Sequence, residues 1–128
     1  MATQQIAVAR GDIVYVDLSG ATGGEKKNDA AVGARPCVVL QNDGGNKGSP
    51  LTIVAPLTDA AQYKRYPQQV QVSAAQVKVI GPTAKDSIVE CGHLRSIDRT
   101  RISKNCGAID AAVMPAIDAA LKSSLGIK

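Results

Sequence analysis

The sequence contains no phenylalanine and no tryptophan, and its only large aromatic residues are Tyr15, Tyr63 and Tyr66. Hydrophobic residues still make up 45% of the 128 positions, so we expect a core of Val, Ile, Leu and Ala. RRM and OB modules bind single strands by stacking bases on aromatic side chains of a sheet. The scarcity of aromatic residues argues against those two modules.

Cysteine and long apolar runs are also scarce. Cys37, Cys91 and Cys106 are odd in number and have no C-x-x-C spacing, which argues against a disulfide framework and a zinc site. Cys37 lies in an apolar run and is most simply a small buried residue. No segment has the length of a membrane span or the pattern of a signal peptide. We therefore expect a cytoplasmic protein without membrane contact, metal or other cofactor.

The sequence has only a small excess of positive charge. It contains 15 Lys and Arg and 11 Asp and Glu, which gives a net charge of +4. The excess permits a polyanionic partner without requiring one. Basic residues do gather locally, at Arg95, Arg99, Arg101 and Lys104, with Asp98 as the one acid among them. Such a stretch attracts polyanions, although most stretches of this kind are solvated faces.

The length predicts a single domain over residues 10–128, preceded by a flexible N-terminal segment, residues 1–9. Short β-branched or alternating segments predict six strands, over residues 12–18, 36–41, 51–57, 69–72, 77–80 and 87–91. Turn residues separate them, as in a small barrel or sandwich. Pro56 indicates an edge or a bulge in its strand.

Two connections stand out between these strands. Residues 19–34 form a long segment rich in glycine, alanine and charge, and loops of this length are usually functional or disordered. Residues 42–50 (NDGGNKGSP) are dense in turn residues and predict a hairpin connection.

The pattern changes near the C-terminus, where apolar residues recur every four positions, at Ile109, Val113, Ile117 and Leu121. This spacing predicts one amphipathic helix packed on the barrel. Asp110 is a candidate N-cap, but Pro115 would then remove a helical hydrogen bond. The helix therefore begins near Met114 or is kinked there, and Gly126 ends it.

Arg35 is the strongest candidate for a functional side chain. It follows the long polar loop and precedes a buried strand, so its backbone is anchored while its side chain faces the loop. A guanidinium is planar, permanently charged and bidentate, and therefore suits phosphate oxygens better than an ammonium does. Taken alone, however, such an arginine is more often a solvated charge or a salt-bridge partner.

Eight segments occur in an order typical of one protein family: RGDIVYVDL (10–18), GGE (23–25), GARPCVVLQND (33–43), GNKGSP (45–50), IVAPLT (53–58), DS (86–87), RSIDRTRI (95–102) and ALKSSLG (120–126). On these segments the chain resembles the MazF/PemK (Kid) growth-inhibitor toxins over about residues 10–125.

The resemblance implies a mainly β fold, an SH3-like barrel of the MazF/CcdB type with a C-terminal helix, and a homodimer. It also implies a metal-independent endoribonuclease that cuts single-stranded mRNA at short sequences, leaving 2′,3′-cyclic phosphate and 5′-hydroxyl ends. The expected partner is a labile antitoxin similar to MazE or PemI, whose acidic tail fills the RNA groove.

In this family the arginine of the G-x-R-P motif and the threonine at the strand end are catalytic, and these match Arg35 and Thr58. Without the resemblance, Thr58 is an ordinary strand-end threonine. We assign Arg35 to the phosphate, because a preorganised cation stabilises the charge that develops there. The hydroxyl of Thr58 would donate to the same phosphate.

For substrate binding the resemblance points to the loop residues Gly24, Glu25 and Lys26, and we add His93 and Arg99 from the basic stretch. Glu25 would read a base edge or orient Arg35; taken alone it is a solvated loop acid. His93 would move a proton, or serve as a structural or rim residue.

The chain also departs from part of the family. Some relatives carry an arginine and an aspartate shortly before R-[ST]-I-D as their acid and base, and Glu90 and Gly92 stand at those places here. That mechanism does not transfer. We interpret Arg95 and Asp98 of the motif as a structural salt bridge at a strand end.

Two other functions remain open. CcdB toxins share the fold but poison DNA gyrase instead of cutting RNA, and a basic SH3-like adaptor would bind a protein. Arg35 and Thr58 favour the nuclease, because a gyrase inhibitor has no use for them. An adaptor would need an aromatic groove for proline-rich ligands, which the composition does not supply.

Overall fold

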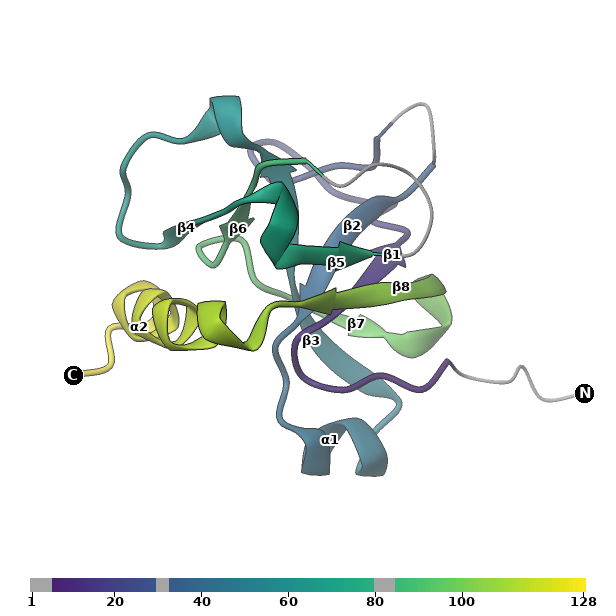
Figure 1. Ribbon diagram of the computed structural model, residues 1–128. Coiled ribbons are helices and arrows are strands. Elements are labelled where there is room, and N and C mark those ends of the chain that lie inside the picture. The colour runs from purple at the N-terminus through teal and green to yellow at the C-terminus, as the bar shows by residue number, and fades with distance from the viewer. Residues whose placement is uncertain (1–5, 30–32, 80–84) are drawn as a thin grey trace, which may run out of the picture.

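The computed structural model describes residues 6–29, 33–79 and 85–128. Its strands are β1 (Asp12–Val16), β2 (Arg35–Val39), β3 (Leu51–Asp59), β4 (Gln69–Val72), β5 (Val77–Val79), β6 (Ser87–Glu90), β7 (Arg95–Asp98) and β8 (Ile102–Ile109). Its helices are α1 (Asp43–Gly48), α2 (Met114–Leu125) and the short 3-10 helices Ala60–Gln62, Ala74–Gln76, Arg99–Arg101 and Ala111–Val113. Figure 1 shows the strands curling around one another, with α2 beside them.

The strands form one sheet in the order β4-β6-β3-β2-β1-β8-β5, and β7 pairs with β3 off this path. Every pairing is antiparallel. The curled sheet and the C-terminal helix confirm the prediction of a mainly β, SH3-like barrel. All six predicted strands begin within one residue and end within two residues of the observed bounds, whereas β7 and β8 were not predicted. Ile80, the predicted end of β5, lies outside the described residues.

β3 is the longest strand because it serves two partners along one of its edges. Its first half pairs with β7 up to Val54, and its second half pairs with β6 from Leu57 onward. Pro56 lies between these two pairings and faces Cys37 of β2 across its other edge. A proline lacks the N–H that a sheet partner needs, so it fits where the strand exchanges neighbours. Pro56 was predicted to mark an edge or a bulge, and in the structure it marks the place where β3 changes its partner from β7 to β6.

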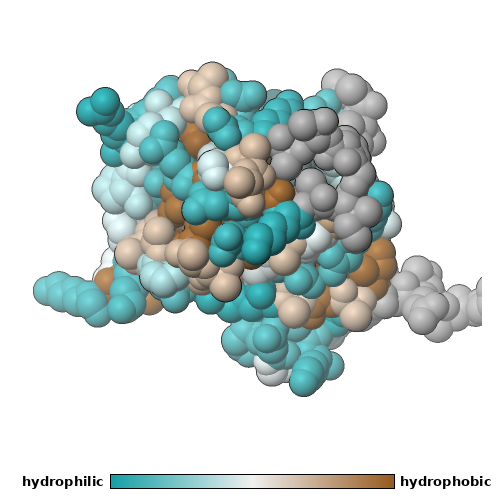
Figure 2. Space-filling model, in the orientation of Figure 1, coloured by the Kyte–Doolittle hydropathy of each residue, from teal (hydrophilic) through white to brown (hydrophobic). Residues whose placement is uncertain are grey.

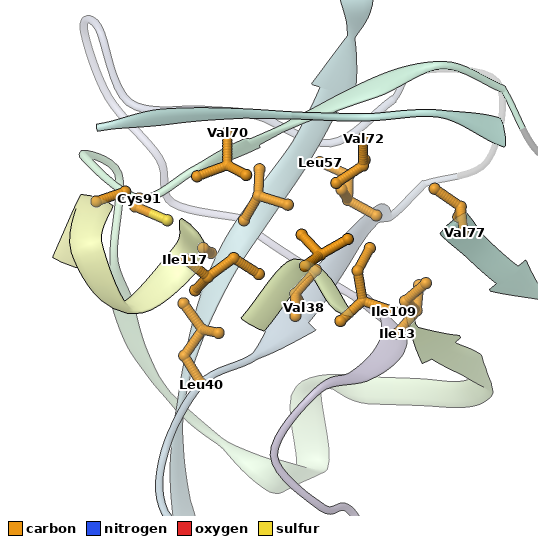
Figure 3. Close-up of a cluster of buried hydrophobic side chains, with 14 of the residues drawn as sticks. Ile13, Val38, Leu40, Leu57, Val70, Val72, Val77, Cys91, Ile109 and Ile117 are labelled. Atoms are coloured by element: carbon orange, nitrogen blue, oxygen red, sulfur yellow. The ribbon is translucent and has the colours of Figure 1, made fainter. Parts of the chain in front are cut away.

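Successive side chains of a strand point to opposite faces of the sheet. In the central strands both sets of side chains are buried, each in its own cluster. Ile13 and Val38 belong to a cluster that also contains Ile109, whereas Val14 and Val39 belong to a second cluster on the opposite face. Figure 3 shows the first cluster, with side chains from several strands pointing toward one another. On the face drawn in Figure 2, hydrophobic patches near the centre and at the right-hand side lie among hydrophilic side chains.

α2 covers the first cluster with Ile117 and Ala120 (Figure 3). Pro115 lies in its first turn, where its missing N–H breaks no helical bond. Gly126 adopts φ 70°, the left-handed conformation of a helix C-cap. The start near Met114 and the end at Gly126 are therefore confirmed. Asp110 caps the preceding 3-10 turn by accepting from Ala112 N at 2.9 Å, rather than α2 itself.

Residues 42–50 connect the antiparallel neighbours β2 and β3, as predicted, but α1 occupies most of this connection in place of a simple turn. Asn42 caps the helix by accepting a hydrogen bond from Gly45 N at 2.7 Å. Asn46 is buried, and its side chain bonds both Gln41 O at 3.0 Å and Thr52 Oγ1 at 2.7 Å. These side-chain bonds offset the low helix propensity of the glycines in α1.

The N-terminal segment is partly held in place. Residues 1–5 lie outside the described residues, but Ile6 and Val8 pack against the second cluster. Within the ranges that the structure describes, no helix is both long and apolar enough to cross a membrane.

Candidate functional site

Arg35 and Thr58 lie opposite each other at the same end of two neighbouring strands. β2 and β3 are antiparallel, with Cys37 paired to Pro56. Extending this register by two residues places Arg35 opposite Thr58 on one face of the sheet, where opposed side chains have Cβ atoms about 5 Å apart. The structure thus brings together the two residues that the sequence assigned to catalysis, although it does not test that role.

The guanidinium of Arg35 is half-buried, and only some of its N–H groups make hydrogen bonds. Nη1 donates to the main-chain oxygen of Leu57 at 3.3 Å, and Nε donates to that of Lys27 at 2.5 Å. A guanidinium has five N–H donors, and the others bind no group in the described part of the chain. Two neutral oxygens therefore fix the orientation of Arg35 and leave its positive charge without a carboxylate partner.

Thr58 is a buried polar residue, 6% exposed, and its Oγ1 makes no hydrogen bond to any described residue. A buried hydroxyl without a partner costs about 1–3 kcal/mol. Such orphaned groups are uncommon in folded proteins and are typical of functional sites. The hydroxyl lies beside a cation whose donors are partly free, so an anion in contact with both would satisfy them.

A cleft of about 210 Å3 lies further along the same two strands, and neither Arg35 nor Thr58 is among its lining residues. It is lined by Leu18, Glu25, Lys26, Cys37, Val54, Pro56, Gly92, His93, Leu94 and Arg95. Cys37 and Pro56 are two positions from Arg35 and Thr58, and therefore lie on the same face of their strands. The cleft combines loop residues from 25–26 with the β6–β7 turn, 91–94. Three of the predicted binding residues, Glu25, Lys26 and His93, lie on its wall.

A second, smaller hollow of about 150 Å3 adjoins the cleft and is lined by Lys26, Gln62, Lys64, Tyr66, Gln68, Gln69, Glu90 and His93. We call it the Tyr66 pocket. Lys26 and His93 line both hollows, so the two form one continuous surface. No functional role was predicted for residues 62–69 from the sequence. Their one signal is a tyrosine that follows a lysine and an arginine.

Lys26 and Glu90 form an ion pair at this junction. Lys26 Nζ lies 3.6 Å from the carboxylate of Glu90, which is only 4% exposed. The pair connects the β1–β2 loop to β6. Glu90 is therefore a charge partner of the loop, and sequence reasoning noted it only as a departure from the family pattern.

Glu25 does not orient Arg35. Its Oε1 accepts hydrogen bonds from Thr22 N at 3.2 Å and from Thr22 Oγ1 at 2.9 Å. These bonds, with the nearby positive charge of Arg95, lower the pKa of Glu25. Gly24 is exposed and does not line either hollow.

Arg95 and Asp98 do not form the expected salt bridge. Arg95 donates instead to the main-chain oxygens of Leu18 at 3.2 Å and Ser19 at 3.4 Å, and so holds the start of the β1–β2 loop. Asp98 accepts from Thr100 N and Oγ1 and caps the next 3-10 turn. Among the described residues no ion pair joins the two.

Arg99 is buried away from the cleft, contrary to a role in substrate binding. Nη1 donates to Asn46 O at 2.6 Å and Nη2 donates to Ile6 O at 2.7 Å. The guanidinium thus ties α1 and the N-terminal segment to the end of β7. We correct its assignment to a structural one, because a side chain enclosed in this way presents no charge to RNA.

The cysteines and the acidic residues offer no other chemistry. Burial raises the pKa of Cys37 to about 12, although the charges of Arg35 and Arg95 oppose this. Its thiol is therefore neutral and unreactive at physiological pH. In residues 6–29, 33–79 and 85–128, no three His, Cys, Asp or Glu residues are grouped so that they could hold a metal ion.

The solved structures similar to this chain include MazF toxins. MazF from Deinococcus radiodurans superposes with a TM-score of 0.72 at 26% identity, over 94% of this chain and 98% of that one. An endoribonuclease in complex with its cognate antitoxin from a mycobacterial species superposes with a TM-score of 0.69 at 20% identity, covering 95% and 98% of the two chains. The architecture is therefore that of the MazF toxins.

Sequence comparison gives the family. The model of the PemK-like, MazF-like toxins of type II toxin–antitoxin systems matches residues 9–125. The chain is 34% identical over 120 residues to endoribonuclease MazF of Staphylococcus epidermidis, which covers 94% of this chain and 92% of that protein. It is also 34% identical to endoribonuclease EndoA of Bacillus subtilis (strain 168), over 94% and 96% of the two chains. The chain belongs to the PemK-like, MazF-like toxin family.

Proposed function

We propose that the chain is an endoribonuclease that cuts single-stranded RNA without a metal ion, as the toxin of a type II toxin–antitoxin pair. The family and its curated endoribonuclease relatives support the enzyme class. The observation that carries the chemistry is the partly free guanidinium of Arg35 opposite the unpartnered hydroxyl of Thr58.

The reaction that fits these groups uses the ribose 2′-oxygen as nucleophile. The 2′-oxygen loses its proton to a base and bonds to the adjacent phosphorus, while the bond from phosphorus to the 5′-oxygen breaks. The 5′-oxygen gains a proton, which leaves a 2′,3′-cyclic phosphate and a 5′-hydroxyl. Charge builds up on the non-bridging oxygens in the transition state, and there Arg35 and Thr58 act as fixed donors.

Arg35 is suited to this role because its position is fixed before substrate arrives. The Leu57 and Lys27 carbonyls hold the guanidinium in place, so little reorganisation accompanies the reaction. Thr58 Oγ1 gains its first partner when a phosphate oxygen approaches. The N–H groups of Arg35 that bind neither carbonyl are left for the phosphate, so neither of these two contacts has to break.

The cleft supplies the substrate contacts. Lys26 attracts the phosphate backbone, and Glu25 accepts from a base edge. His93 is exposed on the wall between the two hollows, where it contacts the RNA or moves a proton. We expect His93 to contribute less to the rate of cleavage than Arg35 does, because no contact fixes its side chain relative to Arg35 and Thr58 among the described residues.

We also propose a homodimer and an acidic antitoxin. Leu51 and Ile53 are exposed apolar residues on β3, 45% and 36% accessible, and offer a surface for a second copy. Solved relatives include an endoribonuclease bound to its cognate antitoxin. The net charge of +4 favours an acidic segment as inhibitor, because such a segment competes with RNA for the cleft.

The test is to map cut sites and end groups on a long RNA with the wild type and with Arg35→Ala and Thr58→Val. We expect cyclic phosphate and 5′-hydroxyl ends, unchanged in EDTA. Loss of the Arg35 guanidinium should lower the rate roughly 10²–10³-fold. Lys104→Ala is the charge-matched control, since Lys104 is exposed on β8 outside both hollows. A metal requirement, 5′-phosphate products, or gyrase inhibition without RNA cleavage would refute the proposal.

A further inference from the structure

We propose that the Tyr66 pocket is a nucleobase subsite, in which the ring of Tyr66 stacks on one base of the RNA and Gln68 contacts its edge. This inference rests on the proposed function, because it extends the substrate path from the cleft onto the adjoining surface. It assigns a role to residues that belong to no motif of the sequence.

The exposure of Tyr66 is the first observation. Its side chain belongs to one of only three large aromatic residues, yet 51% of the residue is exposed. Tyr66 makes no hydrogen bond through its hydroxyl to any described group. An aromatic face in this position contributes nothing to the core, whereas base stacking on such a face is worth about 1–3 kcal/mol.

The loop that carries Tyr66 is held rigid. Gln69 Oε1 accepts from Lys64 N at 2.8 Å, and Gln69 Nε2 donates to Gln62 O at 3.3 Å, closing the loop from within. Arg65 has φ 61°, a conformation that side chains seldom adopt. The neighbouring Tyr66 is therefore held on a preorganised turn, which lowers the entropy that binding would cost.

The β6–β7 turn anchors the other side of the loop. Cys91 N donates to Gln68 O at 2.9 Å, and the loop projects beside this turn in Figure 1. Gly92 permits this approach, because a Cβ there would lie 2.7 Å from Gln68 Cγ. The stem of Gln68 thus occupies the space that a side chain at position 92 would need.

Gln62 and Gln68 both bring to the pocket a side-chain amide that bonds no other group among the described residues, whereas the amide of Gln69 is used within the loop. Gln68 is the less exposed of the two, and its main-chain oxygen is anchored to the β6–β7 turn. An amide offers both a donor and an acceptor and so complements a base edge. Gln68 is therefore the group that selects a base, while Tyr66 binds any base.

Charge and size fit a nucleotide. Lys26 and Lys64 line the pocket and face the phosphates on either side of a stacked base, with Glu90 already paired to Lys26. The volume of about 150 Å3 is below the roughly 300–1,000 Å3 of pockets for drug-sized ligands. It is the size class of one planar ring system. An acidic peptide would use the lysines but not the aromatic face or the free amide.

Tryptophan fluorescence tests the stacking directly, because the chain has no tryptophan. Tyr66→Trp introduces a single emitter in the pocket, and Tyr63→Trp introduces one on the same loop outside it. The probe is a random pool of 2′-O-methyl octaribonucleotides, which block the proposed cleavage. We expect quenching with Tyr66→Trp and little with Tyr63→Trp, and none with inorganic phosphate or a poly-glutamate peptide.

Affinity gives a second measurement on the same oligonucleotides. Tyr66→Ala should weaken binding roughly 5- to 150-fold, and Tyr66→Phe should retain it, because stacking needs the ring and not the hydroxyl. Gln68→Ala should change which of four homopolymers binds best, without removing binding. Equal quenching at positions 63 and 66, equal quenching by the peptide, or wild-type affinity of Tyr66→Ala would overturn the subsite.

The two proposals fail separately. If the wild type cuts RNA but Tyr66→Ala binds and cuts like the wild type, only the subsite is refuted. If the wild type leaves RNA intact, the nuclease proposal is refuted, while the quenching experiment still decides whether a base stacks on Tyr66. Arg35→Ala should lose cleavage and keep the quenching, measured in the Tyr66→Trp background.

Discussion

Lys26 Nζ lies 3.6 Å from the buried carboxylate of Glu90, and this ion pair joins the β1–β2 loop to β6 between the two hollows. Lys26→Met should lower the free energy of unfolding by about 1–3 kcal/mol, because it leaves a buried charge without its partner. Urea denaturation at neutral pH measures the loss.

The double variant Lys26→Met/Glu90→Gln should regain most of that stability, since it leaves no buried charge. RNA affinity should stay low in both variants, because each lacks the Lys26 ammonium. If both variants unfolded at the wild-type urea concentration, the pair would be a surface contact without energetic weight.

His93 and Arg35 should differ in their effect on cleavage. His93→Ala should lower the rate constant less than the roughly 10²–10³-fold expected for Arg35→Ala, because His93 is exposed and bonded only through its main-chain N–H to Glu90 O. Single-turnover cleavage with saturating enzyme separates rate from binding. Circular dichroism serves as the control for folding. Equal losses in two well-folded variants would place His93 in the reaction as a proton carrier.

Arg99 should matter for folding and not for RNA. Arg99→Ala should destabilise the protein by about 3 kcal/mol, since it removes two charge-assisted hydrogen bonds to buried carbonyls. Arg99→Lys should restore little, because one ammonium cannot reach both oxygens. The folded fraction should bind RNA as the wild type does. Weakened binding by a well-folded variant would return Arg99 to the substrate path.

Asp17 should give the protein an acid-sensitive component of stability. Hydrogen bonds from Ser19 and Asn28 lower the pKa of Asp17 to about 2 from its usual value of 3.8. Its contribution is therefore fully present above about pH 4 and is lost as pH falls toward 2. Asp17→Asn should be less stable than the wild type at pH 6, and the difference should close between pH 4 and pH 2. A constant difference across that range would contradict this account.

Local signals in the sequence predicted the parts of the fold that depend on local chemistry. Pro115 and Gly126 mark the two ends of α2 because their backbone preferences act at their own positions. The connection over residues 42–50 was predicted but its helix was not, because the glycines indicate turns, whereas the helix depends on bonds that Asn42 and Asn46 make. β8 was missed because Ser103, Lys104 and Asn105 are polar and exposed.

The candidate site shows the same division. Arg35 and Thr58 were found from the sequence, with the family resemblance, because each stands at the end of a predictable strand. Arg99 was misplaced since nothing local distinguishes a guanidinium in solvent from one bonded to Asn46 and Ile6, which lie 53 and 93 residues away. The Tyr66 pocket was missed because it forms only when residues 62–69 meet the β6–β7 turn.

The position of α2 in the first cluster bears on when this toxin becomes harmful. Val113, Ile117 and Ala120 complete that cluster, and they are synthesised after every strand of the barrel. A nascent chain that ends before them leaves the apolar face of its sheet uncovered and cannot settle into the active shape. We therefore expect the barrel to close only after α2 has been synthesised, near the end of translation.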